Sequence, residues 1–237
     1  MSDFEKWKAY IRGAEGKLTW DEYDCDLQAA VSLFNTHLKS TAGYRQLDWK
    51  IIKAMLWVET GAGSAQWKTK PLQIGVKGDP GLAALLGKTE GGELILPPSL
   101  QGKLTSVTTV PSQNIRAGIG YLLMRMANFE HRTIASSDTK VYEIKVVAGD
   151  SLDKIAKKNG TTIDVLQSMN EKTAVLRIGQ VLKFTKASIQ RVITSWRVIS
   201  NKLIAERYNG GGDTRYAEKL DFVALQIAGR KDVICAP

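Results

Sequence analysis

Apolar residues recur at helical spacing through the first and last parts of the chain. Spacings of three and four residues predict helices over 3–12, 19–39, 114–130 and 188–207, and a last helix that begins near residue 216. Asn114 is a plausible cap for the third of these helices. The positions that they should bury are Leu27, Val31, Phe34, Leu38, Ile115, Gly118, Ile119, Leu122, Met126, Ile189, Val192, Ile193, Trp196, Ile199, Leu203, Tyr216, Leu220, Val223 and Ile227. We therefore expect the outer parts of the chain to be almost entirely α-helical.

The hydrophobic period changes in the segment between them. Tyr142, Ile144 and Val146 alternate with polar neighbours, which is typical of a half-buried strand. The predicted order is strand, turn, helix, helix and strand, over 141–147, 149–151, 152–159, 162–170 and 179–184. This pattern predicts a small βααβ module of about 45 residues within a helical chain.

One carboxylate falls on an apolar helical face. Ile52, Met55 and Leu56 form the stripe, and Glu59 takes the next place on it. Gly61 follows closely and should end the helix, so Glu59 lies in the last turn, where the helix dipole is negative. Burial and the dipole both disfavour the ionised form and should raise the pKa of Glu59, as a general acid near neutral pH requires. The alternative is a partly exposed glutamate in a frayed last turn.

The composition of the chain indicates a basic protein that can bury a core. The chain has 237 residues, of which 43% are hydrophobic, so it can bury a sizeable core in one or two domains. Its net charge of +9 suits a polyanionic partner, although no basic run selects nucleic acid, an acidic wall polymer or a membrane surface. Cys25 and Cys235 leave open a disulfide or two free thiols, and we favour free thiols. His37 and His131 lack recognisable partners, and no zinc, phosphate-loop or serine-triad pattern is present, so we expect no metal and no cofactor.

The N-terminal residues contain no apolar segment of the kind found in a secretory signal peptide, and no stretch approaches the roughly 18 apolar residues of a membrane span. We therefore expect a protein that is made in the cytoplasm, is not inserted in a membrane and carries no Sec-type address. A substrate outside the cytoplasm would be reached by lysis, through a dedicated secretion machine or as part of a particle.

The inner module resembles a LysM domain over its whole length. The resemblance rests on YEIKVVAGDSL at 142–152, Ile155, Ala156, Gly160, Leu166, Asn170 and LRIGQVL at 176–182, with Ser151 in place of the usual threonine. The family binds chains that contain N-acetylglucosamine, so the resemblance implies a peptidoglycan or chitin ligand. The ligand would lie between a turn and the connection to the last strand, on Gly149, Asp150, Ser151, Leu152, Asn170 and Ile178. The alternative is a degenerate module that acts as a spacer.

The helical parts resemble the lysozyme-like fold of lytic transglycosylases and goose-type lysozymes. Four motifs occur in the family order: Glu59–Thr60, PLQIG at 71–75, NIRAGIGYL at 114–122 and RYNGG at 207–211. Pro71, Leu72 and Arg207 depart from the family pattern. The resemblance implies an α+β chain, in which a mainly α lysozyme-like catalytic domain, residues 1–140 and 187–237, is interrupted by the LysM domain at 141–186.

By this resemblance Glu59 is the general acid that cleaves the β-1,4 bond between N-acetylmuramic acid and N-acetylglucosamine. Gln73 would hold an acetamido group, and Tyr208 would orient Glu59 or the sugar. The residues expected to bind substrate are Thr60, Gln73, Ile74, Tyr121, Tyr208 and Asn209, although Asn209 could serve only the turn.

The presence of a second catalytic carboxylate would separate two outcomes. In a transglycosylase the muramoyl 6-hydroxyl closes on its own anomeric carbon and no second carboxylate is needed, whereas an inverting muramidase needs one about 6.5–9.5 Å from the acid. Asp79 is the candidate, and Asp213 is the runner-up. Their alternative roles are a turn before a proline and helix capping.

Together these resemblances predict a peptidoglycan-degrading glycosidase, a lytic transglycosylase or a muramidase, that is targeted to the bacterial cell wall by LysM. It would act in the periplasm after non-Sec delivery as an antibacterial secreted effector, with an immunity protein or a secretion-system component as partner, or as a phage endolysin. We favour the effector because lysins usually carry their binding module at a terminus. The alternatives are a non-catalytic wall-binding or assembly protein and a chitin-directed enzyme. We do not expect nucleic acid as a partner, since no recognition motif accompanies the charge.

Overall fold

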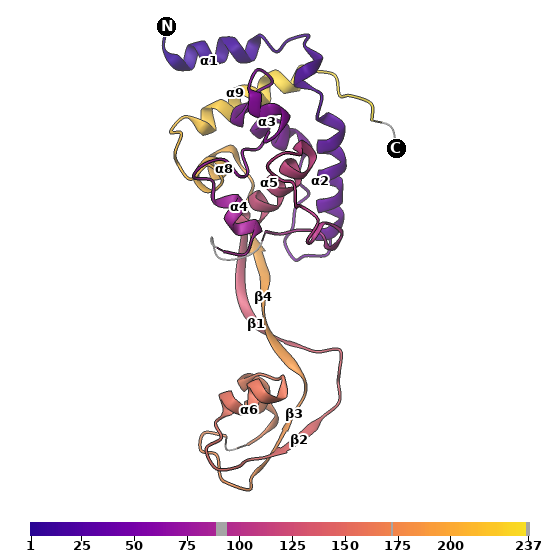
Figure 1. The fold of residues 1–237 in the computed structure, drawn as a ribbon, viewed down its shortest axis with the longest axis vertical. Coiled ribbons are helices and arrows are strands. Elements are labelled where there is room, and N and C mark those ends of the chain that lie inside the picture. The colour runs from indigo at the N-terminus through magenta and orange to yellow at the C-terminus, as the bar shows by residue number, and fades with distance from the viewer. Residues whose placement is uncertain (89–93, 172, 236–237) are drawn as a thin grey trace. The chain divides into compact units, whose positions relative to one another are not determined.

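The computed structural model describes residues 1–88, 94–171 and 173–235, and the chain divides into two units. Unit 1 comprises Met1–Ala127 and Ser195–Pro237, and unit 2 comprises Asn128–Thr194. The helices of unit 1 are α1 (Asp3–Arg12), η1 (Leu18–Trp20), α2 (Asp24–Leu38), α3 (Trp49–Glu59), η2 (Ala65–Lys68), α4 (Pro80–Leu85), η3 (Pro98–Leu100), α5 (Pro111–Met126), α8 (Asn201–Arg207) and α9 (Tyr216–Ala228), as Figure 1 shows. Within the described residues no helix is both long and apolar enough to cross a bilayer.

The core of unit 1 is built around α5, which is buried along most of its length. Small residues permit this, because a side chain at Gly120 would come within 2.8 Å of the carbonyl oxygen of Ile95. The backbone of residue 95 therefore approaches α5 closely at this glycine. Pro111 starts the helix, so Asn114 lies one turn inside it and is not its cap. Around α5 lie α2, α4 and α8, and α9 packs against α3 and α8.

Both ends of unit 1 are tied together near α2. A disulfide joins Cys25 to Cys235, with 5.4 Å between the Cα atoms, so our preference for free thiols is wrong. Arg230 Nε donates to Asp21 Oδ1 at 3.0 Å, and the Nζ atom of the buried Lys53 lies 2.6 Å from the same oxygen. The segment after α9 is thereby fixed against the start of the chain.

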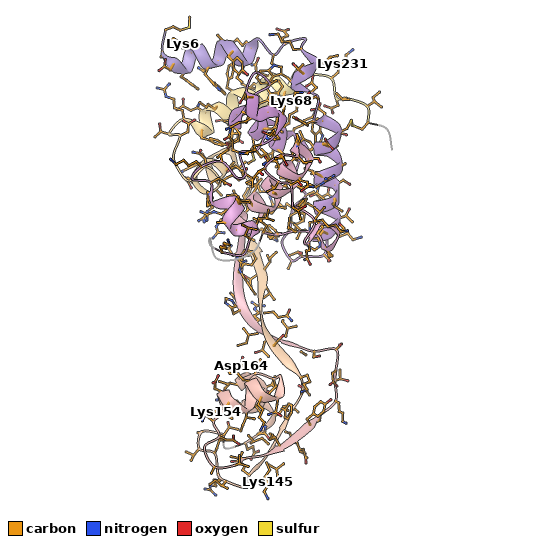
Figure 2. The ribbon with its side chains drawn as sticks, in the orientation of Figure 1. Lys6, Lys68, Lys145, Lys154, Asp164 and Lys231 are labelled. Carbon is orange, nitrogen blue, oxygen red and sulfur yellow. A yellow bond between two sulfur atoms is a disulfide. The ribbon has the colours of Figure 1, made fainter. Side chains whose placement is uncertain are left out.

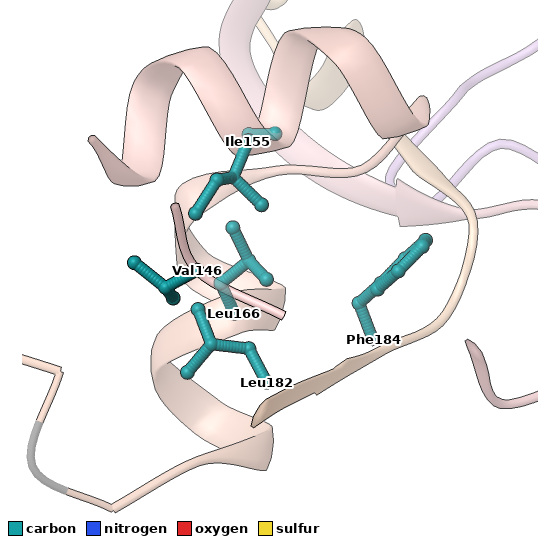
Figure 3. Close-up of a cluster of buried hydrophobic side chains, with 6 residues drawn as sticks. Val146, Ile155, Leu166, Leu182 and Phe184 are labelled. Carbon is teal, nitrogen blue, oxygen red and sulfur yellow. The ribbon is translucent and has the colours of Figure 1, made fainter. Parts of the chain in front are cut away.

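Unit 2 contains two pairs of strands and two helices. Its elements, with the ends of the first and last at the unit boundary, are β1 (Ala127–Ala135), β2 (Tyr142–Lys145), α6 (Leu152–Asn159), α7 (Ile163–Met169), β3 (Val181–Phe184) and β4 (Ala187–Trp196). β2 pairs with β3 in antiparallel register, and Ile144 lies opposite Leu182. Side chains from both strands and both helices meet in one core, in which Figure 3 labels Val146, Ile155, Leu166, Leu182 and Phe184. The predicted βααβ order is confirmed.

The structure corrects the prediction on either side of that module. Residues 127–135 and 187–196 are strands that pair with each other, although we expected helix over 114–130 and 188–207. The apolar spacing of Ile189, Val192 and Ile193 suits a helix, but these β-branched residues favour an extended chain, and pairing with β1 supplies the hydrogen bonds of the backbone. Unit 2 therefore extends beyond the 141–186 expected for the inserted domain.

Candidate functional site

Glu59 is the last residue of α3, and the apolar stripe before it is buried as predicted. Asp48 begins this helix by accepting a hydrogen bond from Lys50 N–H, and Thr60 ends it. The carboxyl group of Glu59 is half-buried, and its Oε1 accepts a hydrogen bond of 2.6 Å from the hydroxyl of Tyr216 at the start of α9. The acid is thus held where α3 meets α9.

Burial raises the pKa of Glu59 from its ordinary value of 4.5 to about 7. The hydrogen bond from Tyr216 acts in the opposite direction, because it favours the ionised carboxylate. The negative charges of Asp79 and Asp213 raise the pKa further, and Lys219 lowers it. Near neutral pH a substantial fraction of the molecules therefore carries a proton on Glu59, which is the condition for a general acid.

The loop at 71–75 lies beside the end of α3. Thr60 Oγ1 lies 3.0 Å from the carbonyl oxygen of Pro71 and 3.2 Å from that of Leu56, so it joins the loop to the helix. Gln73 Nε2 donates to the backbone carbonyl of Glu59 at 3.0 Å. Gln73 also has a φ of 61°, a left-handed conformation that a non-glycine residue adopts at a cost. The surroundings must hold it there.

Asn114 is the residue that holds the loop from behind. It is fully buried, and its side chain accepts from Leu72 N–H at 2.9 Å and donates to the carbonyl oxygens of Ile74 and Val107 at 2.9 and 2.8 Å. The hydroxyl of Tyr208 donates to the carbonyl of Leu72 at 2.9 Å. Three backbone groups of the loop are thereby bound to side chains from α5 and from the residue after α8.

Three predicted substrate-binding side chains belong to the core instead. Ile74 is 1% exposed and Tyr121 is 2% exposed, so neither presents its side chain to a ligand. Tyr208 is also buried, with its ring 5.5 Å from that of Tyr121. The hydroxyl of Tyr208 donates to Leu72, and the hydroxyl that donates to Glu59 is that of Tyr216, so the expected role of Tyr208 in orienting Glu59 or the sugar stays a prediction.

The two candidate second carboxylates have structural partners. Asp79 is the N-cap of α4, and it accepts from the N–H groups of Gly75, Gly81 and Leu82 at 2.7, 2.9 and 3.1 Å. This is the alternative role that we gave it, so its expected role as catalytic base is not supported by its contacts. Asp213 accepts from Arg215 N–H at 3.0 Å and from Lys219 Nζ at 2.5 Å, and these partners outweigh partial burial and lower its pKa.

Asn209 serves the turn after α8, which was the alternative that we left open. With its amide oriented so that the oxygen faces the turn, Asn209 accepts from the N–H groups of Gly212 and Asp213, the second at 2.9 Å. This turn positions the start of α9, where the backbone N–H of Tyr216 donates to the carbonyl of Asp213 at 3.0 Å. Asn209 therefore acts on the site by placing Tyr216.

In unit 2 the predicted turn and the predicted connection meet at one end of the β2–β3 pair. Val146 N–H donates to the carbonyl of Gln180, and Gly179 N–H donates to that of Val146, both at 2.8 Å, which brings residue 178 beside the turn that follows β2. Ile178 is 76% exposed, and Val147 is 57% exposed. An apolar surface thus borders the turn, in the place that the sequence predicted for a ligand.

Comparison with known families decides what this part of the chain is. Residues 144–185 match the family described as LysM domain. They form a LysM domain. The match indicates peptidoglycan binding by this part of the chain. No curated protein and no solved structure matches the chain significantly.

Within the LysM domain the predicted site residues divide into two groups. Asp150, Ser151 and Asn170 serve the fold: Asp150 accepts from Val147 N–H, Ser151 caps α6, and the amide of Asn170 binds both backbone groups of Lys183. Leu152 packs against the core. The side chain of Ile178 and the backbone of Gly149 are exposed.

Basic side chains surround this end of the domain. Figure 2 labels Lys145 and Lys154 on it, and Lys154 Nζ donates to the carbonyl of Gly149 at 2.8 Å. An exposed apolar residue beside backbone polar groups suits an acetamido group, which needs a donor, an acceptor and space for a methyl. The positive charges suit the acidic groups of a wall polymer.

Proposed function

We propose that unit 1 is a peptidoglycan glycosidase that cleaves the β-1,4 bond between N-acetylmuramic acid and N-acetylglucosamine, and that the LysM domain brings it to the wall. The observation that carries this proposal is the raised pKa of Glu59 and its hydrogen bond from Tyr216. A carboxyl group with a pKa of about 7 ends an apolar helix and is hydrogen-bonded by a buried hydroxyl, in a chain that also carries a wall-binding domain.

In this mechanism Glu59 donates a proton. The leaving oxygen of the glycosidic bond takes the proton while positive charge develops on the sugar ring. Glu59 then becomes a carboxylate, and the hydrogen bond from Tyr216 stabilises the charge that appears. The same bond keeps Oε1 in one place, which leaves the second carboxyl oxygen to face the substrate. The partners of Thr60 and Gln73 fix the neighbouring backbone against which an acetamido group would lie.

The partners of the other carboxylates favour the lytic route. Asp79 is bound to three backbone N–H groups, and Asp213 is paired with Lys219. In the lytic route the muramoyl 6-hydroxyl attacks its own anomeric carbon and gives its proton to the Glu59 carboxylate, which has just protonated the leaving oxygen, so no second carboxylate has to activate a water. The product carries a 1,6-anhydro end and is lighter than the hydrolytic product by one water.

The test is to incubate the full chain with purified peptidoglycan and to resolve the released fragments by mass. We expect anhydro ends, with activity lost in Glu59→Gln and kept in Glu218→Gln, a matched change at an exposed position on α9. Reducing muramic ends would replace the lytic route by hydrolysis. Cleavage that survives in Glu59→Gln would remove this residue from the mechanism, and sedimentation with peptidoglycan without any cleavage would favour a non-catalytic wall-binding protein.

The disulfide favours action outside a reducing cytosol. Cys25 and Cys235 are bonded, and such bonds persist in oxidising compartments such as the periplasm, where the wall lies. We propose delivery to that compartment as an antibacterial effector that a producing cell neutralises with an immunity protein. Directing the chain to the periplasm of a test bacterium should cause lysis, whereas the same amount kept in the cytoplasm should not. Equal toxicity from both locations would contradict this proposal.

A further inference from the structure

We propose that α1 and the start of α9 form a second sugar-binding position, which takes a muramoyl unit of the same glycan strand at a distance from the bond that is cut. The inference rests on the proposed function, since it extends the glycan site of unit 1. Its basis is a surface hollow of about 340 Å³ whose lining includes Asp3, Phe4, Trp7, Asp213, Arg215 and Lys219. Nothing in the LysM match concerns these residues, which all lie in unit 1.

The start of α9 links the hollow to the candidate acid. Tyr216 binds Glu59, and Lys219 follows it by one turn on the same face of α9, where it is paired with Asp213 at 2.5 Å. The charges of Asp213 and Lys219 both act on Glu59, in opposite directions. A strand that passes over Glu59 along the start of α9 would therefore reach the hollow.

The loop after Glu59 contacts α1, the helix that carries Phe4 and Trp7. Gly63 N–H donates to the hydroxyl of Tyr10 on α1 at 2.8 Å. The ring of Tyr10 also lies against Gly61, where an added side-chain carbon would come within 3.0 Å of its hydroxyl. The helix that carries Phe4 and Trp7 is thus held against the residues that follow the acid.

The lining has the composition of a carbohydrate site. Phe4 and Trp7 are stacked with centroids 5.9 Å apart and 9° between their planes, and both stay partly exposed, although Trp7 also packs against Phe222. The Arg215 guanidinium lies 4.9 Å from the ring centre of Phe4 and Lys219 Nζ lies 5.3 Å from that of Trp7, so a pyranose would contact the rings beside these cations. The Asp213–Lys219 ion pair offers an acceptor and a donor to its hydroxyls. Asp3 and Arg215 bring the four charges of the lining to balance, and the exposed Arg215 can donate to the lactyl or stem carboxylate of a muramoyl unit.

The distribution of tryptophan makes this inference testable in the full chain. All six tryptophans lie outside residues 128–194, so indole N–H signals in a ¹⁵N-correlated NMR spectrum report on unit 1 and not on the LysM domain. The protein is the Glu59→Gln variant, which prevents cleavage, and the probe is a soluble peptidoglycan hexasaccharide of alternating N-acetylglucosamine and N-acetylmuramic acid. The Trp7 signal is assigned by its loss in Trp7→Leu.

We expect the hexasaccharide to shift the Trp7 indole signal and to leave that of Trp49, at the opposite end of α3, unchanged. In the otherwise native enzyme, Trp7→Leu should lower kcat/KM for long strands roughly tenfold, while Trp49→Ala should not. Leucine keeps an apolar side chain against Phe222, and an unchanged unfolding midpoint separates lost binding from lost folding.

Two results would overturn the second position. One is a Trp7 indole signal that stays fixed at a saturating concentration of hexasaccharide, and the other is a Trp7→Leu enzyme that is folded and cleaves long strands at the native rate. A native chain that never cleaves peptidoglycan, but whose Trp7 signal shifts, would refute the proposed function and leave this binding position standing. The two proposals therefore fail on different measurements.

Discussion

Replacing Glu59 by glutamine should stabilise unit 1 while abolishing the proposed activity. Glutamine keeps the length of the side chain and an oxygen that can accept from Tyr216, but it cannot ionise. The structure places this carboxyl at a half-buried position where ionisation is costly, and the pKa rises from 4.5 to about 7 as a result. In the unfolded chain the same group ionises near its ordinary value.

The size of the effect follows from linkage between protonation and folding. Between the unfolded and the folded pKa the native state binds more protons than the unfolded state, so stability falls as pH rises through this window. A rise from 4.5 to about 7 corresponds to roughly 3 kcal/mol of stability that is present at low pH and lost by pH 7 to 8. The variant should thus match the native protein below pH 4.5 and exceed it by about this amount above pH 7.

Urea unfolding at half-unit steps from pH 4 to pH 8.5 measures this difference. Tryptophan fluorescence is the suitable signal, because the six tryptophans lie outside residues 128–194 and so follow unit 1 alone. Glu218→Gln, an exposed change on α9, is the control and should leave the curve within about 0.5 kcal/mol of the native one. Parallel curves for Glu59→Gln and the native protein across the whole range would show that the carboxyl is not held in a costly environment, and the reasoning about the acid would fail.

Four further changes test other contacts. Tyr216→Phe removes the hydrogen bond that favours the carboxylate, so the pKa of Glu59 should rise and the alkaline limb of the pH–rate profile should move to higher pH. Asn114→Ala leaves three buried backbone groups unpaired and should cost roughly 3 kcal/mol or more in urea unfolding. Cys235→Ser opens the disulfide and should cost about 2–4 kcal/mol, as treatment of the native protein with reductant should also do. Ile178→Asp should weaken sedimentation with peptidoglycan without changing stability, since this side chain is 76% exposed.

Elements with strong local signals could be predicted from the sequence almost to the residue. The helix predicted over 152–159 is α6, because Ser151 accepts from Lys154 N–H at its start and Gly160 takes a left-handed φ of 62° at its end. The predicted helix over 3–12 is α1, which has a serine cap of the same kind. Caps act within four residues, so they can be read without knowledge of the tertiary structure.

The β1–β4 pair could not be predicted in the same way. Ile189, Val192 and Ile193 satisfy the spacing of a helical face, and the alternating pattern that would identify a strand is weak because β4 is only partly buried. What decides the conformation is the presence of a partner strand 60 residues earlier in the chain, at Ala127–Ala135. Such a partner cannot be inferred from a window of a dozen residues.

In the candidate site, too, some features could be predicted from local sequence and others depend on tertiary packing. The stripe that leads to Glu59 is local, and it correctly predicted a costly position for a carboxylate. Tyr216 lies 157 residues away, and its position in the sequence indicated only a buried residue of the last helix. Its role as the partner of the acid depends on how α9 packs against α3. Asn114 was a plausible cap by residue type, whereas two of its three hydrogen bonds are made to Leu72 and Ile74, which lie 42 and 40 residues earlier.

The arrangement around Glu59 combines two costly features with anchors drawn from distant parts of unit 1. The raised pKa of Glu59 lowers the stability of the protein at neutral pH, and Gln73 beside it adopts a left-handed backbone conformation. Neither feature would persist in an isolated helix and loop, because burial within unit 1 raises the pKa of Glu59 and Asn114 on α5 holds the loop that contains Gln73. A glutamate that served only the surface of a frayed helix would need none of these contacts. The contact of Glu59 with α9 and the contacts of the neighbouring loop with α5 are therefore the strongest structural argument for the proposed role of this carboxyl group.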